Sequence, residues 1–130
     1  MDNNAPIIEN DKSHQKVEYL DKIYDLALNG INGISEPLDK LVNDYVRQYG
    51  RTEKAIDKMV SSQRLKVTTT GFVTGLGGLL TLPIAIPVDL GSSLYIEMRM
   101  IAAIASLRGY DIHHDQVRTL IYACMVGNAL

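Results

Sequence analysis

An uncharged run punctuated by glycine and proline is the feature that most constrains the fold of this chain. No residue from Val67 to Val88 carries a charge, and about 20 apolar residues suffice for a helix to cross a bilayer. However, each glycine weakens a helix by roughly 1 kcal/mol relative to alanine, and each proline removes a backbone donor and obstructs the preceding turn. These breaking residues are Gly71, Gly75, Gly77, Gly78, Pro83 and Pro87. The run is therefore predicted to be two short helical pieces around a break near residues 71–88, not a regular membrane span.

The rest of the sequence predicts an all-α protein with about five helices. Apolar residues recur at helical spacing, and no strand alternation or hairpin turn is present. Ser35 and Thr52 are typical N-cap residues, and Gly50 and Gly109 are typical stops. The expected helices cover residues 12–28, 36–49, 53–67, 88–108 and 114–125.

Composition limits the domain organisation and the function class. The segment 1–11 is rich in Asn and Asp without any period, which predicts a disordered tail, and residues 12–130 are enough for a single helical domain. The formal net charge of -2 gives no electrostatic case for nucleic-acid binding. The single cysteine, Cys124, lies in an apolar stretch and is expected to be buried and inert.

Two motifs that could suggest a metal or a nucleotide fail on spacing. His113, His114 and Asp115 are adjacent, so on a helix their side chains diverge by about 100°, and only His14 remains to complete a metal site. The glycine cluster from Gly75 lacks the third glycine of a dinucleotide loop, because position 80 is Leu80. No metal and no cofactor are expected. The Gly71-x-x-x-Gly75 spacing instead favours close packing of another helix.

A polar band interrupts the expected helix 88–108. Glu97 and Arg99 are about 200° apart on a helix and cannot pair with each other. If that helix is buried, Asp89 or Arg99 must face a polar cavity or an opposite charge on another element. A charged stripe facing water on a surface helix is the alternative.

Basic residues flank the uncharged run on both sides. This pattern suits a segment whose two ends stay on the cytoplasmic side, as in a re-entrant or surface-inserted hairpin. Solvated helix faces balanced by Glu53, Asp57 and Glu97 are the alternative. The basic residues are Lys54, Lys58, Arg64 and Lys66 before the run, and Arg99, Arg108 and Arg118 after it.

The chain resembles the EcsC family in several spaced motifs. They are Thr70–Pro83, Pro87–Asp89, Arg99 with Ile101–Ala102, and Gly109–Asp111. The resemblance implies a bacterial helical protein, named for a gene beside an ATP-binding-cassette (ABC) transporter, without an assigned activity. Family members are generally longer, so the chain is expected to be truncated at its C-terminus. The matching positions include Asp89, Arg99 and Asp111, and the resemblance transfers no catalytic role to any of them.

These observations lead to one main hypothesis and two alternatives. The main hypothesis is a non-enzymatic, membrane-associated protein at the cytoplasmic face, accessory to an ABC transporter or to membrane-protein handling, with the membrane surface or a membrane protein as its partner. The first alternative is a soluble hydrolase-like enzyme in which Asp89, Arg99 and Asp111 converge on a cleft. The second is a soluble, self-associating helical bundle that uses the glycine strip as its interface.

Overall fold

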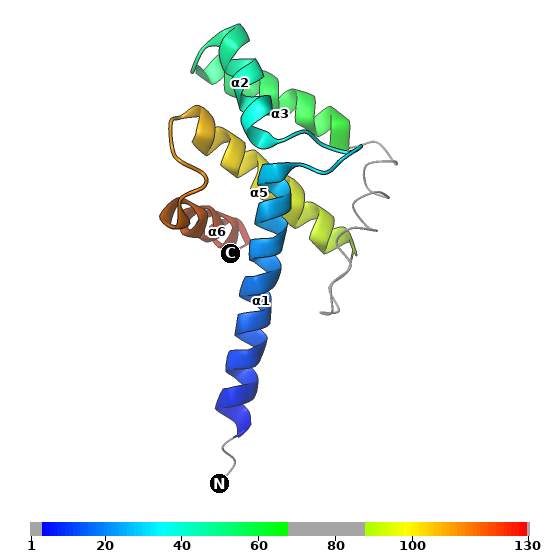
Figure 1. Cartoon of the computed structure of the whole chain (residues 1–130), viewed down its shortest axis with the longest axis vertical. Coiled ribbons are helices and arrows are strands. Elements are labelled where there is room, and N and C mark those ends of the chain that lie inside the picture. Colours follow the sequence, from blue (N-terminus) through cyan, green and yellow to red (C-terminus); the bar gives the residue numbers. More distant parts are fainter. Residues whose placement is uncertain (1–3, 68–87, 130) are drawn as a thin grey trace.

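Five helices make up the part of the chain that the structure, a computed structural model, describes: residues 4–67 and 88–129. No strand is present in these residues, apart from an isolated bridge between Ile31 and Ser35. The all-α fold class is thereby confirmed. The predicted helical break falls almost wholly outside the described residues. The helices are α1 (Asn4–Asn29), α2 (Leu38–Tyr49), α3 (Glu53–Val67), α5 (Val88–Leu107) and α6 (Asp115–Ala129) (Figure 1).

Helix α5 is the centre of the bundle and packs against α1, α2, α3 and α6. Its sequence explains this position, because apolar side chains occur on nearly all sides of it. Between residues 91 and 107 only Ser93 and Glu97 are exposed. Ala102 and Ala103 are fully buried, and their small side chains allow neighbouring helices to approach closely.

Helix α1 differs from the expectation at its start. It begins at Asn4, so residues 4–11, which were expected to be a disordered tail, are helical. Pro6 does not prevent this, because a proline in the first turn lacks only a donor that has no partner within the helix. The N-terminal half of α1 extends away from the other helices (Figure 1). From Val17 onward, where the burial of side chains is described, the first buried residue is Tyr19.

The helix ends follow the sequence at three of the four places with a clear signal. Gly50, with a φ of +72°, is the C-cap of α2. The Thr52 hydroxyl accepts the N–H of Ala55 at 3.3 Å, so the predicted N-cap of α3 is confirmed. Gly109 has a φ of +97°, and the N–H of Tyr110 reaches back to the carbonyl of Ala105 at 3.0 Å, as in a Schellman motif. Ser35, predicted to cap α2, does not do so, because the N-cap position is taken by Pro37.

Candidate functional site

Arg99 is the most unusual side chain in the core, because it is a cation that is only 3% exposed. Its Nη1 donates to the carbonyl oxygen of Ala27 at 2.7 Å, and its Nη2 donates to the carbonyl oxygen of Glu36 at 2.6 Å. Ala27 lies in the last turn of α1, where a cation is favoured by the helix dipole. Arg99 therefore ties the end of α1 and the start of α2 to the middle of α5.

The electrostatics of Arg99 follow from this burial. Desolvation lowers the pKa of its guanidinium, and Tyr95 and Glu36 partly oppose that shift. Since the ordinary pKa of arginine exceeds 12, the group stays protonated. The sequence led us to expect that a buried Arg99 would face a polar cavity or an opposite charge. Its hydrogen bonds in the structure go to backbone carbonyls instead.

The loop between α1 and α2 is shaped around this contact. Gly30 has a φ of +77°, and a Cβ there would lie 2.6 Å from the carbonyl carbon of Glu36 and from the carbonyl oxygen of Ser35. Only glycine fits at this position, because the positive φ is unfavourable for other residues and because there is no space for a Cβ. The N–H of Ile31 donates to the Ser35 carbonyl at 2.8 Å. The loop is thereby folded tightly enough to present the Glu36 carbonyl to α5.

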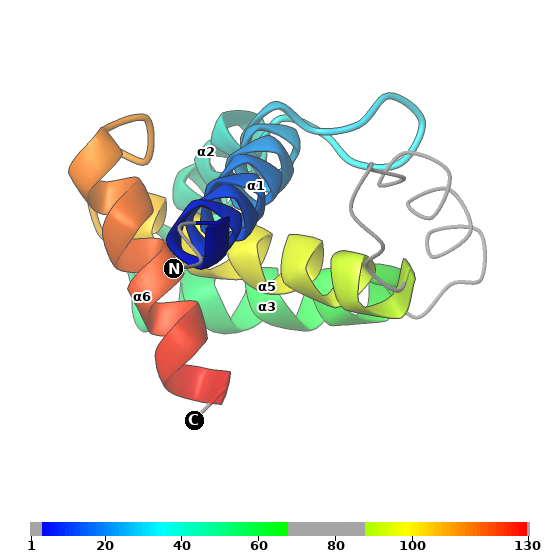
Figure 2. The ribbon, with the colours of Figure 1, turned by 90° about the horizontal axis from the view of Figure 1, so that it is seen from below.

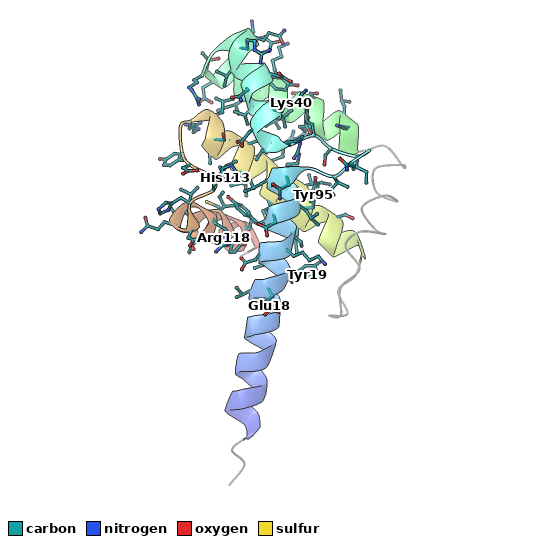
Figure 3. The ribbon with its side chains drawn as sticks, viewed as in Figure 1. Glu18, Tyr19, Lys40, Tyr95, His113 and Arg118 are labelled. Atoms are coloured by element: carbon teal, nitrogen blue, oxygen red, sulfur yellow. The ribbon has the colours of Figure 1, made fainter. Side chains whose placement is uncertain are left out.

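Ser92 and Tyr95 extend the polar cluster along the same side of α5. The spacings from Ser92 to Tyr95 and from Tyr95 to Arg99 are three and four residues, which place all three on one face. Tyr95 is fully buried where α5 passes α1 (Figure 3), and its hydroxyl shares a 2.5 Å hydrogen bond with the Ser35 hydroxyl. Among the described residues, the buried polar side-chain atoms without a hydrogen-bond partner are Ser92 Oγ and Arg99 Nε. The cluster thus joins three elements through the hydrogen bonds of Arg99 and also contains two buried donor groups, Ser92 Oγ and Arg99 Nε, that have no partner.

Asp89, Arg99 and Asp111 do not gather at one point of the described fold. Asp89 belongs to the first turn of α5, ten residues before Arg99, which corresponds to about 15 Å along a helix axis. Asp111 follows the C-terminal end of α5, is exposed, and accepts the N–H of His113 at 3.0 Å. These positions along α5 and beyond its end do not bring the three residues together in a catalytic cleft.

The other predicted site residues divide into two groups. The predicted packing residues Gly71, Gly75, Gly77, Gly78, Pro83 and Pro87 lie outside the described residues. Of the flanking cations, Arg108 pairs with Glu53 at 2.9 Å, and Arg118 pairs with Asp115 at 3.3 Å. Cys124 is exposed on α6, and the expectation that it is buried was wrong, because α6 turns only one of its faces to the bundle.

The histidines and acidic residues of the described segments form no cluster of three metal-ligating side chains. His113 Nε2 instead lies 3.1 Å from Asp39 Oδ2. This pair connects the turn before α6 to the first turn of α2, at an exposed position. The contact is a surface link between two elements of the bundle.

A tyrosine network between α1 and α6 was not predicted from the sequence. The Tyr24 hydroxyl donates to the carbonyl of Ile112 at 2.6 Å, and the Tyr122 hydroxyl donates to Asp21 Oδ1 at 2.6 Å. The two rings pack edge to face, with centroids 5.9 Å apart. A buried tyrosine generally needs a partner for its hydroxyl. That rule indicates that such bonds exist but does not identify their partners.

The two ends of the uncharged run are held on one side of the bundle. Helix α3 ends at Val67, α5 begins at Val88, and the two helices pack against each other. They run in opposite directions, so that the end of α3 and the start of α5 lie at the same side in both views (Figures 1 and 2). The two points at which the described helices meet the uncharged run therefore lie on the same side of the bundle.

The outer surface of α3 changes character along the helix. Its two acidic residues, Glu53 and Asp57, belong to its first half, and no acidic residue occurs from Lys58 to Val88. Arg64, Leu65 and Lys66 are all exposed just before the uncharged run. None of the described helices combines the length and the apolar content that crossing a membrane requires.

A shallow groove of about 540 Å³ runs between α2 and α3. Helix α2 contributes the rings of Tyr45 and Tyr49, which stack with centroids 6.3 Å apart. Helix α3 contributes Lys58 and Lys66, with Ser62 and Gln63 between them. The α2 side of the groove thus combines aromatic rings with the acidic side chains of Glu36 and Asp44, and its α3 side is polar and basic.

Comparison with known proteins identifies a family for the chain. The model of the EcsC protein family matches residues 7–128 of the chain, which is nearly its whole length and includes the cluster around Arg99 and both ends of the uncharged run. Among curated proteins and among solved structures, none matches.

Proposed function

Since the chain belongs to the EcsC protein family, we propose that it is a non-enzymatic helical protein that associates with the cytoplasmic face of a membrane through its uncharged run. In this role it serves as an accessory to an ABC transporter or to the handling of membrane proteins. The described bundle is the scaffold that holds the two ends of the run in place.

The observation that carries the proposal is the antiparallel packing of α3 and α5. A segment that leaves and returns on one side of a bundle can insert into one leaflet as a hairpin without carrying the bundle across the membrane. Charged residues cost free energy in the apolar interior of a bilayer, and the run from Val67 to Val88 contains none. The cations of α3 directly before the run suit the phosphate level of the same leaflet.

Fractionation of cells that express the untagged chain tests the membrane association. We expect the protein to sediment with membranes, to stay there through a carbonate wash and to be released by detergent. An Ile84→Asp variant adds a charge within the run and should shift the protein to the supernatant, because a carboxylate at the bilayer centre costs about 2.5–3.5 kcal/mol.

The control is Ser93→Asp, which adds the same charge at an exposed position of α5. It should leave the distribution unchanged, and circular dichroism should show equal helix content in both variants. Recovery of the unaltered chain wholly in the supernatant would refute membrane association. Copurification in mild detergent with the subunits of an ABC transporter, identified by mass spectrometry, tests the accessory role separately.

A further inference from the structure

The second half of α3 has an outer surface that combines cations with an exposed leucine. Lys58, Arg64, Leu65 and Lys66 form this surface, named here the basic face of α3, and all four are exposed. Leu65 is 74% exposed, more than any other large hydrophobic side chain whose burial is described. Most of this apolar side chain therefore faces solvent.

The order of these residues around the helix gives the basic face its shape. At about 100° per residue, Leu65 and Lys58 lie within about 20° of each other, while Arg64 and Lys66 lie about 100° to either side of Leu65. Met59 and Gln63, about 120° and 160° around the helix from Leu65, are buried against the bundle. The face therefore has an apolar centre near its C-terminal end, with a cation on each edge.

This arrangement is typical of a helix that lies at a membrane surface. The apolar centre enters the boundary between headgroups and acyl chains, and the long side chains of lysine and arginine extend to the phosphates. The groove beside the face adds space for a headgroup, since Lys58 and Lys66 line its α3 side. On its α2 side, the carboxylates of Glu36 and Asp44 both accept hydrogen bonds from Lys40, which reduces their repulsion of a phosphate.

We propose that the basic face of α3 binds the headgroups of anionic phospholipids and thereby makes the membrane association depend on lipid charge. The inference rests on the proposed function and specifies the class of lipid. Charge complementarity supports it: the segment from Lys58 to Val67 carries cations and no anion. The uncharged run follows the basic face directly in the sequence.

Sedimentation with vesicles tests this inference on the full chain. We expect binding to vesicles of phosphatidylcholine containing phosphatidylglycerol, weak binding to phosphatidylcholine alone, and loss of the difference at high salt. Each Lys or Arg near an anionic surface contributes about a fivefold gain in affinity. The double variant Lys58→Gln, Arg64→Gln should therefore bind the anionic vesicles on the order of 20-fold more weakly.

The matched control is the double variant Lys22→Gln, Arg47→Gln, which removes two cations from exposed positions of α1 and α2. It should keep nearly all of the affinity, because the cations at issue are those of α3. A second variant, Leu65→Ser, should weaken binding to both kinds of vesicle without changing the response to salt. Circular dichroism should show unchanged helix content in every variant.

Three outcomes would overturn the inference. Equal losses in the two double variants would show that net charge alone is responsible. Equal binding of the unaltered chain to neutral and anionic vesicles would refute the preference for anionic lipids but leave the proposed membrane association intact. If the chain binds neither kind of vesicle and is also recovered in the supernatant after cell fractionation, both the lipid inference and the proposed membrane association are refuted.

Discussion

Arg99 is the residue whose role the structure defines most clearly. A buried arginine is costly unless its donors are used, and two of them are used on backbone carbonyls at 2.7 and 2.6 Å. These carbonyls belong to two different elements, the end of α1 and the residue two positions before α2. The arginine therefore replaces hydrogen bonds that the backbone of the loop cannot make by itself.

Replacing Arg99 with Met should destabilise the protein. The substitution keeps much of the apolar stem but leaves the carbonyls of Ala27 and Glu36 without this donor, at a cost of about 1–3 kcal/mol. Urea unfolding followed by circular dichroism measures the change. The exposed Arg47→Met is the control and should change the free energy of unfolding by less than about 0.5 kcal/mol. Equal stability of Arg99→Met and the unaltered chain would mean that the two carbonyls need no side-chain donor.

Gly30 and Gly33 offer a matched pair within one loop. Both have a positive φ, +77° and +80°, but only at Gly30 would a Cβ meet backbone atoms at 2.6 Å. Gly33→Ala should lose about 1–2 kcal/mol through its backbone conformation. Gly30→Ala should lose about 1–3 kcal/mol more through steric overlap. The free energy of unfolding decides this, and equal losses would show that the loop moves freely enough to remove the overlap.

At the scale of elements, α6 is attached to α1 by two tyrosines, and this attachment should weaken in alkali. Burial raises the pKa of Tyr24 to about 12 from an ordinary value of 10.0, so the folded protein holds this proton more tightly than the unfolded chain. The stabilisation is complete below pH 10 and is lost as the pH rises toward 12. Burial, followed by the hydrogen bond to Asp21, shifts the pKa of Tyr122 in the same direction.

The Tyr24→Phe variant tests this dependence. It should be less stable than the unaltered chain at about pH 8, because its hydrogen bond to Ile112 is gone. It should then lose less stability between about pH 8 and about pH 11, because one of the titrating groups is absent. Urea midpoints at the two pH values measure the difference. Parallel losses in both proteins would assign the alkaline weakening to other groups.

The helices themselves could be predicted from sequence, and their contacts could not. Apolar spacing located α2, α3 and α5 to within a few residues, because that spacing reflects which face each helix buries. Ser35 has the chemistry of an N-cap, yet its hydroxyl bonds to Tyr95, sixty residues away. A local sequence pattern cannot show that the distant Tyr95 hydroxyl competes for the Ser35 side chain. The partners of Arg99 could not be predicted either, because backbone carbonyls have no sequence signature.

At the scale of the whole molecule, the helices before and after the uncharged run interlock, because α5 lies among α1, α2 and α3. The end of α3 and the start of α5 lie on one side of the bundle.

The central position of α5 also sets an order of assembly during synthesis. Helices α1, α2 and α3 are complete once Val67 has been made, but the helix against which all three pack begins only at Val88. Until then the apolar faces of the first three helices have only one another to cover them, and the ends of α1 and α2 lack the arginine that joins them. The ribosome therefore synthesises the common partner after all three of them, and the hydrophobic core closes around a helix that leaves the exit tunnel after the uncharged run.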